Sequence, residues 1–217
     1  MASTIFVSYC TLDFEKYIQP LANILRRSGY DVIVYFEDNP PQGDVIVSHI
    51  EASILDVDLF LVADSPNARK SAWVSFEMMV ALHHKKAIYR CQIDDCLSLT
   101  GSSLMLCMEQ QLSHWEKLSV DTVLEAFRRE FEEDKFPTAL RGIDLYEGAA
   151  AAALLSDNSP SDPELFAVID KGPRHLIAVL MALRQTTHDQ NRLPSARQVA
   201  GEVYERLFAA QKKVYVG

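Results

Sequence analysis

Short apolar runs alternate with amphipathic stretches along the first 134 residues. The runs are rich in β-branched and aromatic residues, which predicts buried strands at 5–9, 31–36, 59–63 and 87–93. Between them, apolar residues recur every three to four positions, which predicts helices. A fifth strand is expected near 110–115, and a helix capped by Ser119 over 120–131. This alternation predicts an α/β fold: a flavodoxin-like parallel sheet with helices on both faces.

After residue 134 the alternation stops and only helical patterns continue. An Ala-rich turn is expected at 147–155 and a flexible joint at 156–161. Further helices are expected to start near residues 162, 173 and 195. We therefore expect two parts, residues 1–134 and an α-helical C-terminal extension over 135–217. The apolar stripes of the extension are most simply extra core packed on the first part, and a dimer surface or docking site is the second interpretation.

Composition and charge narrow the class of protein. The 217 residues are 48% hydrophobic and 24% charged, with a mean hydropathy of −0.02, which is typical of a soluble globular protein. Residues 1–134 hold 11 Lys and Arg against 21 Asp and Glu, whereas 135–217 hold 10 against 9. An acidic first part argues against binding of nucleic acids or anionic membranes, which need a basic surface. No signal-peptide pattern and no apolar run of about 20 residues is present, so no membrane association is expected.

The spacing of the cysteines and histidines does not indicate a metal-binding site. Cys10, Cys91, Cys96 and Cys107 form no CxxC pair, and three of them lie in or beside apolar runs that suit buried thiols. A reducing compartment, and hence a cytoplasmic location, is expected. The histidine pair at 83–84 has no partner at helical spacing, so no metal site is predicted.

The stretch 57–82 carries the strongest candidate for chemistry. An apolar run ends at Asp64, and a helical pattern opens near Ala68 that places Glu77 among apolar residues. In α/β proteins, ligands bind at the carboxyl ends of parallel strands, and a helix N-terminus there favours the ionised form of a carboxylate. Glu77 is therefore the first candidate catalytic residue. Helical spacing alone would favour an ordinary solvated glutamate, because most helix glutamates are solvated.

Three motifs resemble the signature boxes of the Toll/interleukin-1 receptor (TIR) domain family. They occur in the family's order and spacing: Phe6-Val7-Ser8-Tyr9 as the first box, Gly43 with Ile46 and Ile50 as the BB loop and its following helix, and Ser65-Pro66-Asn67 with Ser71-x-Trp73-x-x-x-Glu77 as the third-helix motif. The resemblance covers the first 134 residues and implies a TIR domain.

The resemblance implies two possible functions. Many bacterial and plant TIR domains cleave NAD with the glutamate that aligns with Glu77, and the chain is similar to bacterial antiphage TIR proteins such as the Thoeris signal-producing enzymes. We therefore expect an NAD glycohydrolase or ADP-ribose cyclase in antiphage or innate immune defence. It would take NAD as substrate, need no cofactor, and make ADP-ribose or a cyclic ADP-ribose that a downstream effector reads. The alternative is a noncatalytic module that signals by self-association.

The resemblance also implies which residues form the site. Glu77 would be the catalytic residue, with Trp73 as a flat wall for a substrate ring and Ser71 as a hydrogen-bonding neighbour. The remaining substrate-binding residues would follow the first strand and lie in the BB loop: Ser8, Tyr9, Cys10, Phe36 and Gly43. Cys10 stands where some NAD-cleaving relatives have arginine, so phosphate contacts would come from backbone N–H groups or another cation. A homo-oligomer is expected, formed through TIR contacts or the helical tail.

A response-regulator receiver is a further alternative with the same order of strands and helices. Asp64, at the end of the third strand, would then be the phosphoacceptor. A receiver also needs paired acidic residues after the first strand and a lysine after the fifth, to hold Mg²⁺ and the phosphoryl group. Cys10, Thr11 and Leu12 follow the first strand instead, which disfavours this interpretation.

Overall fold

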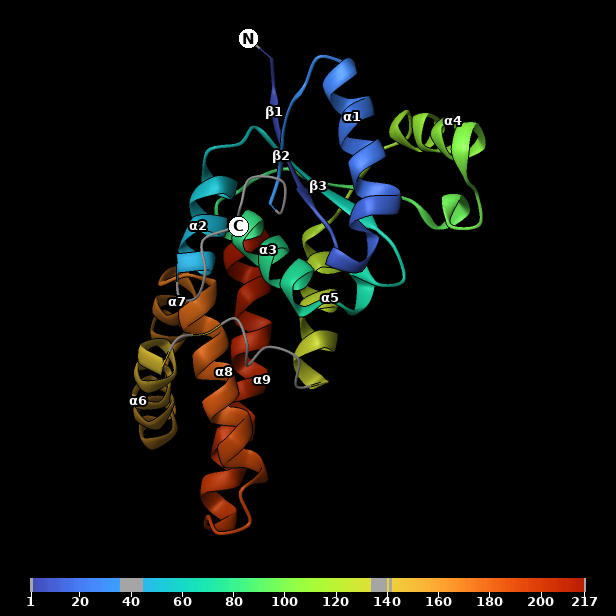
Figure 1. Cartoon of the computed structure of the whole chain (residues 1–217). Coiled ribbons are helices and arrows are strands. Elements are labelled where there is room, and N and C mark those ends of the chain that lie inside the picture. The colour runs from blue at the N-terminus through green and yellow to red at the C-terminus, as the bar shows by residue number, and fades with distance from the viewer. Residues whose placement is uncertain (1, 36–44, 134–139, 141, 217) are drawn as a thin grey trace. The chain divides into compact units, whose positions relative to one another are not determined.

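The computed structural model describes residues 2–35, 45–133, 140 and 142–216 (Figure 1). The chain divides into two compact units, Met1–Lys135 and Phe136–Gly217, which are described separately. The first unit is built on a β-sheet, and the second contains helices α6 to α9.

The sheet of the first unit has five strands in the order β2-β1-β3-β4-β5. β2 (Asp31–Val34), β1 (Thr4–Ser8), β3 (Leu59–Asp64) and β4 (Ile88–Gln92) run parallel. β5 (Glu116–Lys117) pairs antiparallel with β4. The predicted α/β class is confirmed, because this order is the flavodoxin-like one, in which each parallel connection crosses over through a helix.

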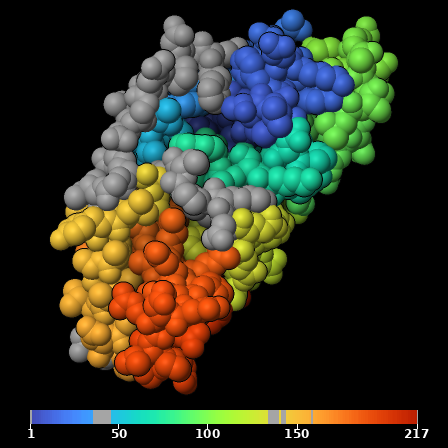
Figure 2. Space-filling view, turned by 60° about the horizontal axis from the view of Figure 1, so that its bottom comes forward, coloured from blue at the N-terminus to red at the C-terminus, as the bar shows by residue number. Residues whose placement is uncertain are grey.

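Helices cover both faces of this sheet, as the sequence predicted. Side chains of neighbouring strand residues point to opposite faces, so alternate residues of β1 enter two different cores. On one face, α1 (Gln19–Arg27) and α4 (Gly101–Leu112) lie side by side over one core cluster (Figure 2). On the other face, α3 (Ala72–His83) packs between α2 (Val45–Leu55) and α5 (Val120–Glu132). Phe6 and Phe60 stack on this second face, with ring centroids 5.5 Å apart.

The prediction of a strand near 110–115 is wrong. Residues 101–112 form α4, and the last strand is the short β5, so the sheet is not wholly parallel. The buried residues Leu104, Cys107 and Met108 explain the difference, because their spacing places them on one face of a helix. At the start of the chain, 3-10 and π turns over 11–18 lead directly into α1, and Pro20 lies in the first turn of α1.

Two cysteines differ from the expectation of four thiols. Cys96 and Cys107 are joined by a disulfide that ties the turn Asp94–Cys96 to α4, whereas Cys10 and Cys91 are free. The Cα atoms of Cys96 and Cys107 lie 5.8 Å apart, and the two residues have a sequence separation of 11. Spacing in the sequence does not reveal this pair, because the predicted elements do not include α4, which carries Cys107.

The second unit consists of α6 (Gly142–Asn158), α7 (Asp162–Asp170), α8 (Pro173–His188) and α9 (Pro194–Val216). The turn expected at 147–155 is wrong, since these residues lie inside α6. The unit's helices pack on one another, chiefly α6 on α8 and α8 on α9, and they bury the apolar stripes between them. Among the helices of the described residues, none combines the length and apolar character that a membrane span requires.

Candidate functional site

A buried hydrogen bond joins the end of β1 to the middle of α3. The Ser8 hydroxyl donates to the Oε2 atom of Glu77 over 2.5 Å. Ser8 is fully buried, and Glu77 is 7% exposed. Ser8 is the last residue of its strand, so the Glu77 carboxyl group lies at the carboxyl edge of the parallel strands. Ligands bind at this edge in doubly wound α/β folds.

Burial decides the protonation state of Glu77. It raises the pKa of the carboxyl group to about 8, and the hydrogen bond from Ser8 lowers it only in part. The expectation that a helix N-terminus keeps Glu77 ionised is therefore wrong for the free protein. Glu77 is the sixth residue of α3, and the effect of the helix dipole falls off within the first turn. Near pH 7 the carboxyl group is mostly protonated.

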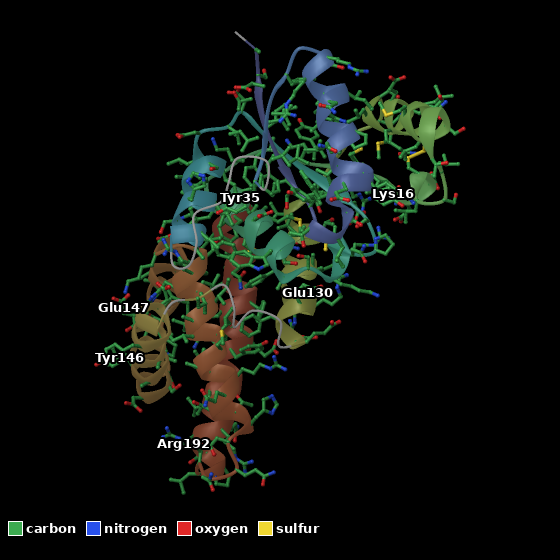
Figure 3. All side chains as sticks on the ribbon, in the orientation of Figure 1. Lys16, Tyr35, Glu130, Tyr146, Glu147 and Arg192 are labelled. Atoms are coloured by element: carbon green, nitrogen blue, oxygen red, sulfur yellow. A yellow bond between two sulfur atoms is a disulfide. The ribbon has the colours of Figure 1, made fainter. Side chains whose placement is uncertain are left out.

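Tyr35 lies close enough to Glu77 to respond to its charge. Burial, and after it the charge of Glu77, raises the pKa of the Tyr35 hydroxyl. Tyr35 follows β2, is 9% exposed, and its ring lies 5.8 Å from that of His49 on α2 (Figure 3). Sequence analysis missed this residue. The available signal was its place at the carboxyl end of the second predicted strand, next to the start of the turn.

Trp73 lies one helical turn before Glu77, so the two side chains share one side of α3. The Trp73 ring is half-buried and meets Phe76 edge-on at 6.2 Å. Ser71 is the N-cap of α3, and its hydroxyl accepts the N–H of Val74 over 3.5 Å. The structure therefore gives Ser71 a structural role, and its predicted contact with a substrate stays a prediction.

The remaining predicted site residues divide into two groups. Tyr9 faces the opposite side of the sheet from Ser8, in the core under α1, where its ring stacks on Phe14. Cys10 is a half-buried free thiol after β1. Phe36 and Gly43 lie outside the described residues. The structure thus joins Ser8 to Glu77, places Trp73 one helical turn before Glu77, and places Tyr9 on the other face of the sheet.

A polar network connects the segments after β1 and β3, and it includes Ser65 and Asn67 of the third-helix motif. Asp13 is 2% exposed and accepts hydrogen bonds from the Ser65 hydroxyl over 2.5 Å and from the Asn67 amide over 2.8 Å. The Ser65 hydroxyl also accepts the N–H of Ala68 over 2.9 Å. This network fixes the turn that precedes α3 and so helps to position the helix that carries Glu77.

The surroundings of Asp64 do not suit a receiver domain. Asp64 is 5% exposed and forms ion pairs with Arg69 at 3.1 Å and Arg90 at 3.7 Å. Asp64 is therefore paired with two guanidinium groups, whereas the phosphoacceptor of a receiver needs paired acids that hold Mg²⁺. Within residues 2–35, 45–133 and 142–216, no three His, Cys, Asp or Glu side chains lie close enough together to hold a metal ion.

Comparison with known proteins identifies the domain to which this site belongs. Residues 5–104 match the family model described as the TIR domain. The match runs from β1 into α4 and includes Ser8, Trp73 and Glu77. No curated protein matches the chain. The resemblance drawn from the motifs is thus confirmed at the level of the domain, in a family that contains both NAD-cleaving enzymes and noncatalytic signalling modules.

Proposed function

Starting from the TIR domain at residues 5–104, we propose that this protein cleaves the bond between nicotinamide and ribose in NAD, with Glu77 as the catalytic residue. The observation that carries the proposal is the buried Ser8–Glu77 pair at the carboxyl edge of the sheet. A solvated helix glutamate would have neither the burial nor the hydrogen bond to a strand end. NAD would be the substrate, and no further cofactor is needed.

The chemistry of NAD explains why a single carboxylate is sufficient. Glycosidases commonly use two carboxyl groups, because an alkoxide leaving group must be protonated while the oxocarbenium-like sugar is stabilised. Nicotinamide departs from a pyridinium nitrogen that is already positive. The bonding electron pair of the C1′–N bond goes to this nitrogen, which becomes neutral, so no general acid is required. The remaining task is to stabilise the cation that develops on the ribose, and one anionic group does this.

Substrate binding would supply the charge state that the reaction needs. In the free protein the Glu77 carboxyl group is mostly protonated near pH 7, since its pKa is about 8. A nicotinamide ring beside it carries a positive charge, which favours the carboxylate and releases the proton to solvent. The ionised group then lies beneath the ribose when the C1′–N bond breaks. Trp73, on the same side of α3, would form a flat wall against a substrate ring.

The nucleophile that reaches the ribose would decide the product. Attack by water gives ADP-ribose and a proton. Attack by the adenine or the distal ribose of the same molecule gives a cyclic ADP-ribose, which a dry pocket favours. We assign the reaction to antiphage or innate immune defence in the cytoplasm, where the product signals to a downstream effector. Self-association of TIR domains would accompany this activity.

Turnover of NAD by the purified full chain tests the proposal. Released nicotinamide would be measured by chromatography for the wild type, Glu77→Gln and Glu109→Gln. Glu77→Gln keeps the shape of the side chain and removes the charge, so we expect kcat to fall at least about 100-fold. Glu109 is an exposed glutamate of α4, and its substitution should leave turnover unchanged.

Two results would contradict the proposal in different ways. Equal turnover by the wild type and Glu77→Gln would remove Glu77 from the mechanism. Absence of turnover in all three proteins, at concentrations where they self-associate, would favour the noncatalytic TIR module.

A further inference from the structure

A cavity lies between α3 and α5, above β3 and β4. It has a volume of about 390 Å³, within the range of small-molecule sites. Val74, Ser75 and Met78 of α3 line it, and Glu77 does not. We infer that this cavity binds a small amphipathic anion, with one phosphate or carboxylate group on an apolar body. This site is separate from the Ser8–Glu77 pair, and its existence does not depend on the proposed function.

Three guanidinium groups from three different elements line the cavity. Arg69 comes from the turn before α3, Arg90 from β4 and Arg129 from α5. Their side chains are 38%, 30% and 52% exposed, so each is accessible to a ligand. The planar guanidinium fork matches the oxygens of phosphate and carboxylate groups. The head group of the ligand is therefore anionic.

The acids around these arginines leave room for such an anion. The buried acid of the cavity is Asp64, which forms ion pairs with both Arg69 and Arg90. The other partners of these arginines are Asp94, at 2.7 Å from Arg69, and Glu116, which hydrogen-bonds Arg90. Glu116 is 60% exposed, and exposed ion pairs contribute little to stability. Asp94 is 35% exposed, and its Oδ1 atom is buried. Glu116 is therefore the partner that a bound anion can displace at low cost.

Arg129 adds the third cation from the opposite wall. Its Nη2 atom donates to the Arg69 carbonyl oxygen over 3.0 Å, which holds the two arginines together. Its Nε atom lies 3.6 Å from the buried Glu130 carboxyl group. Glu125 also lines the cavity, but it lies on the exposed side of α5. Of the charged residues that line the cavity, three are arginines and two, Asp64 and Glu125, are acids, while Asp94, Glu116 and Glu130 pair with the arginines from outside the lining.

The rest of the lining explains why the ligand is an organic anion and not a bare ion. Apolar side chains form much of the wall: Val62 comes from β3, Met78 from α3 and Leu118 from the loop between β5 and α5. The hydroxyl groups of Ser75 and Thr122 stand among them. Inorganic phosphate would leave these apolar surfaces uncovered. A ligand with an aromatic or aliphatic body covers them and gains the free energy of their burial.

Calorimetric titration of the full chain with phenyl phosphate tests this inference. We expect saturable binding of one molecule per chain. Inorganic phosphate lacks the apolar body and benzyl alcohol lacks the charge, so each should bind at least tenfold more weakly. Phenylacetate replaces phosphate by carboxylate, and its affinity relative to phenyl phosphate assigns the head group. Lack of saturable binding by both aromatic anions would overturn the inference.

Two neighbouring arginines of α5 provide a matched pair of variants. Arg129→Ala should weaken phenyl phosphate binding at least tenfold. Arg128→Ala should change it less than twofold, because Arg128 does not line the cavity and pairs with Glu132. Ala126→Trp fills the cavity from its half-exposed wall and should abolish binding while the circular dichroism spectrum stays that of the wild type. Equal affinity in Arg129→Ala and Arg128→Ala, or full binding by Ala126→Trp, would contradict the site.

Discussion

At the scale of single residues, Glu77 makes the folded protein less stable as the pH rises. Its pKa is about 8 in the folded state, above the ordinary value of 4.5. Below pH 4.5 both states hold the proton and no penalty exists. Between pH 4.5 and 8 only the unfolded chain releases it, so the free energy of unfolding falls by up to about 1.4 kcal/mol per pH unit. Buried groups of this kind are common at functional sites, where activity opposes stability.

We therefore predict that Glu77→Gln stabilises the protein at alkaline pH. The amide keeps a hydrogen-bonding partner for Ser8 and has no proton to lose. Urea unfolding at pH 5 and pH 8.5 should give a gain of a few kcal/mol for the variant at pH 8.5 and a much smaller difference at pH 5. The exposed Glu109→Gln serves as control and should follow the wild type at both values. Parallel pH dependence of the wild type and Glu77→Gln would contradict the burial of an ionisable group.

Ser8 should set the pH at which the proposed reaction begins. The active form needs an ionised Glu77, so kcat/KM for NAD should rise with pH and level off above about 8. The hydrogen bond from Ser8 lowers the pKa of Glu77, and its loss raises that pKa further. Ser8→Ala should therefore move the rising limb of the kcat/KM profile to higher pH. Ser102→Ala, on the exposed side of α4, should leave the limb in place. An unchanged limb in Ser8→Ala would show that the limb belongs to another group.

At the scale of elements, α6 and α8 of the second unit approach each other closely at Gly148. A Cβ atom at Gly148 would lie 2.4 Å from the Cβ of Ala178 and 2.5 Å from its backbone carbonyl carbon. Backbone cannot rotate out of the way as a flexible side chain can, so the two helices would have to separate. We predict that Gly148→Ala destabilises the unit by about 1–3 kcal/mol, although alanine is the better helix former.

Gly201 of α9 provides the matched control. A Cβ atom there meets Thr187 at 3.7 Å, which is an ordinary van der Waals contact. Gly201→Ala should therefore stabilise the protein by up to about 1 kcal/mol through helix propensity alone. Thermal unfolding followed by circular dichroism compares the two variants. A stabilising Gly148→Ala would show that α6 and α8 do not pack this closely.

The elements that sequence analysis predicted well are those whose burial follows a simple period. The four parallel strands and the capped helix after Ser119 are present because their apolar positions and cap residues act locally. The prediction of a strand at 110–115 is wrong because α4 buries only a narrow stripe of apolar side chains, and because the Ser-rich start of this helix resembles a loop. The turn expected at 147–155 is wrong because alanine has the highest helix propensity, so the alanine run continues α6.

For the candidate site, the sequence indicated the position of Glu77 but not its charge state. The motif places the carboxyl group near the strand end, whereas the hydrogen bond to Ser8 joins residues 69 positions apart. The Asp13–Ser65 bond spans 52 positions, and the cavity arginines come from three elements. Contacts of this kind depend on the order of strands in the sheet. They become visible only once the fold is known.

At the scale of the whole molecule, the two units differ in charge as well as in architecture. Residues 1–134 carry the acidic excess of the chain, and 135–217 are nearly neutral. The chain thus divides into two units, each of which buries apolar residues among its own elements. The folding of the helical unit can then be tested apart from the site chemistry.

We predict that residues 136–217 fold without the rest of the chain. The contacts of α8 with α6 and α9 lie inside this unit, and buried leucines such as Leu176, Leu180 and Leu183 follow one side of α8. The isolated segment should show a helical circular dichroism spectrum and a single cooperative thermal transition. Leu180→Ala leaves a cavity in this core and should lower the free energy of unfolding by about 2–5 kcal/mol. A transition that is gradual in the segment, and that Leu180→Ala does not shift, would mean that the helices depend on the TIR domain for their structure.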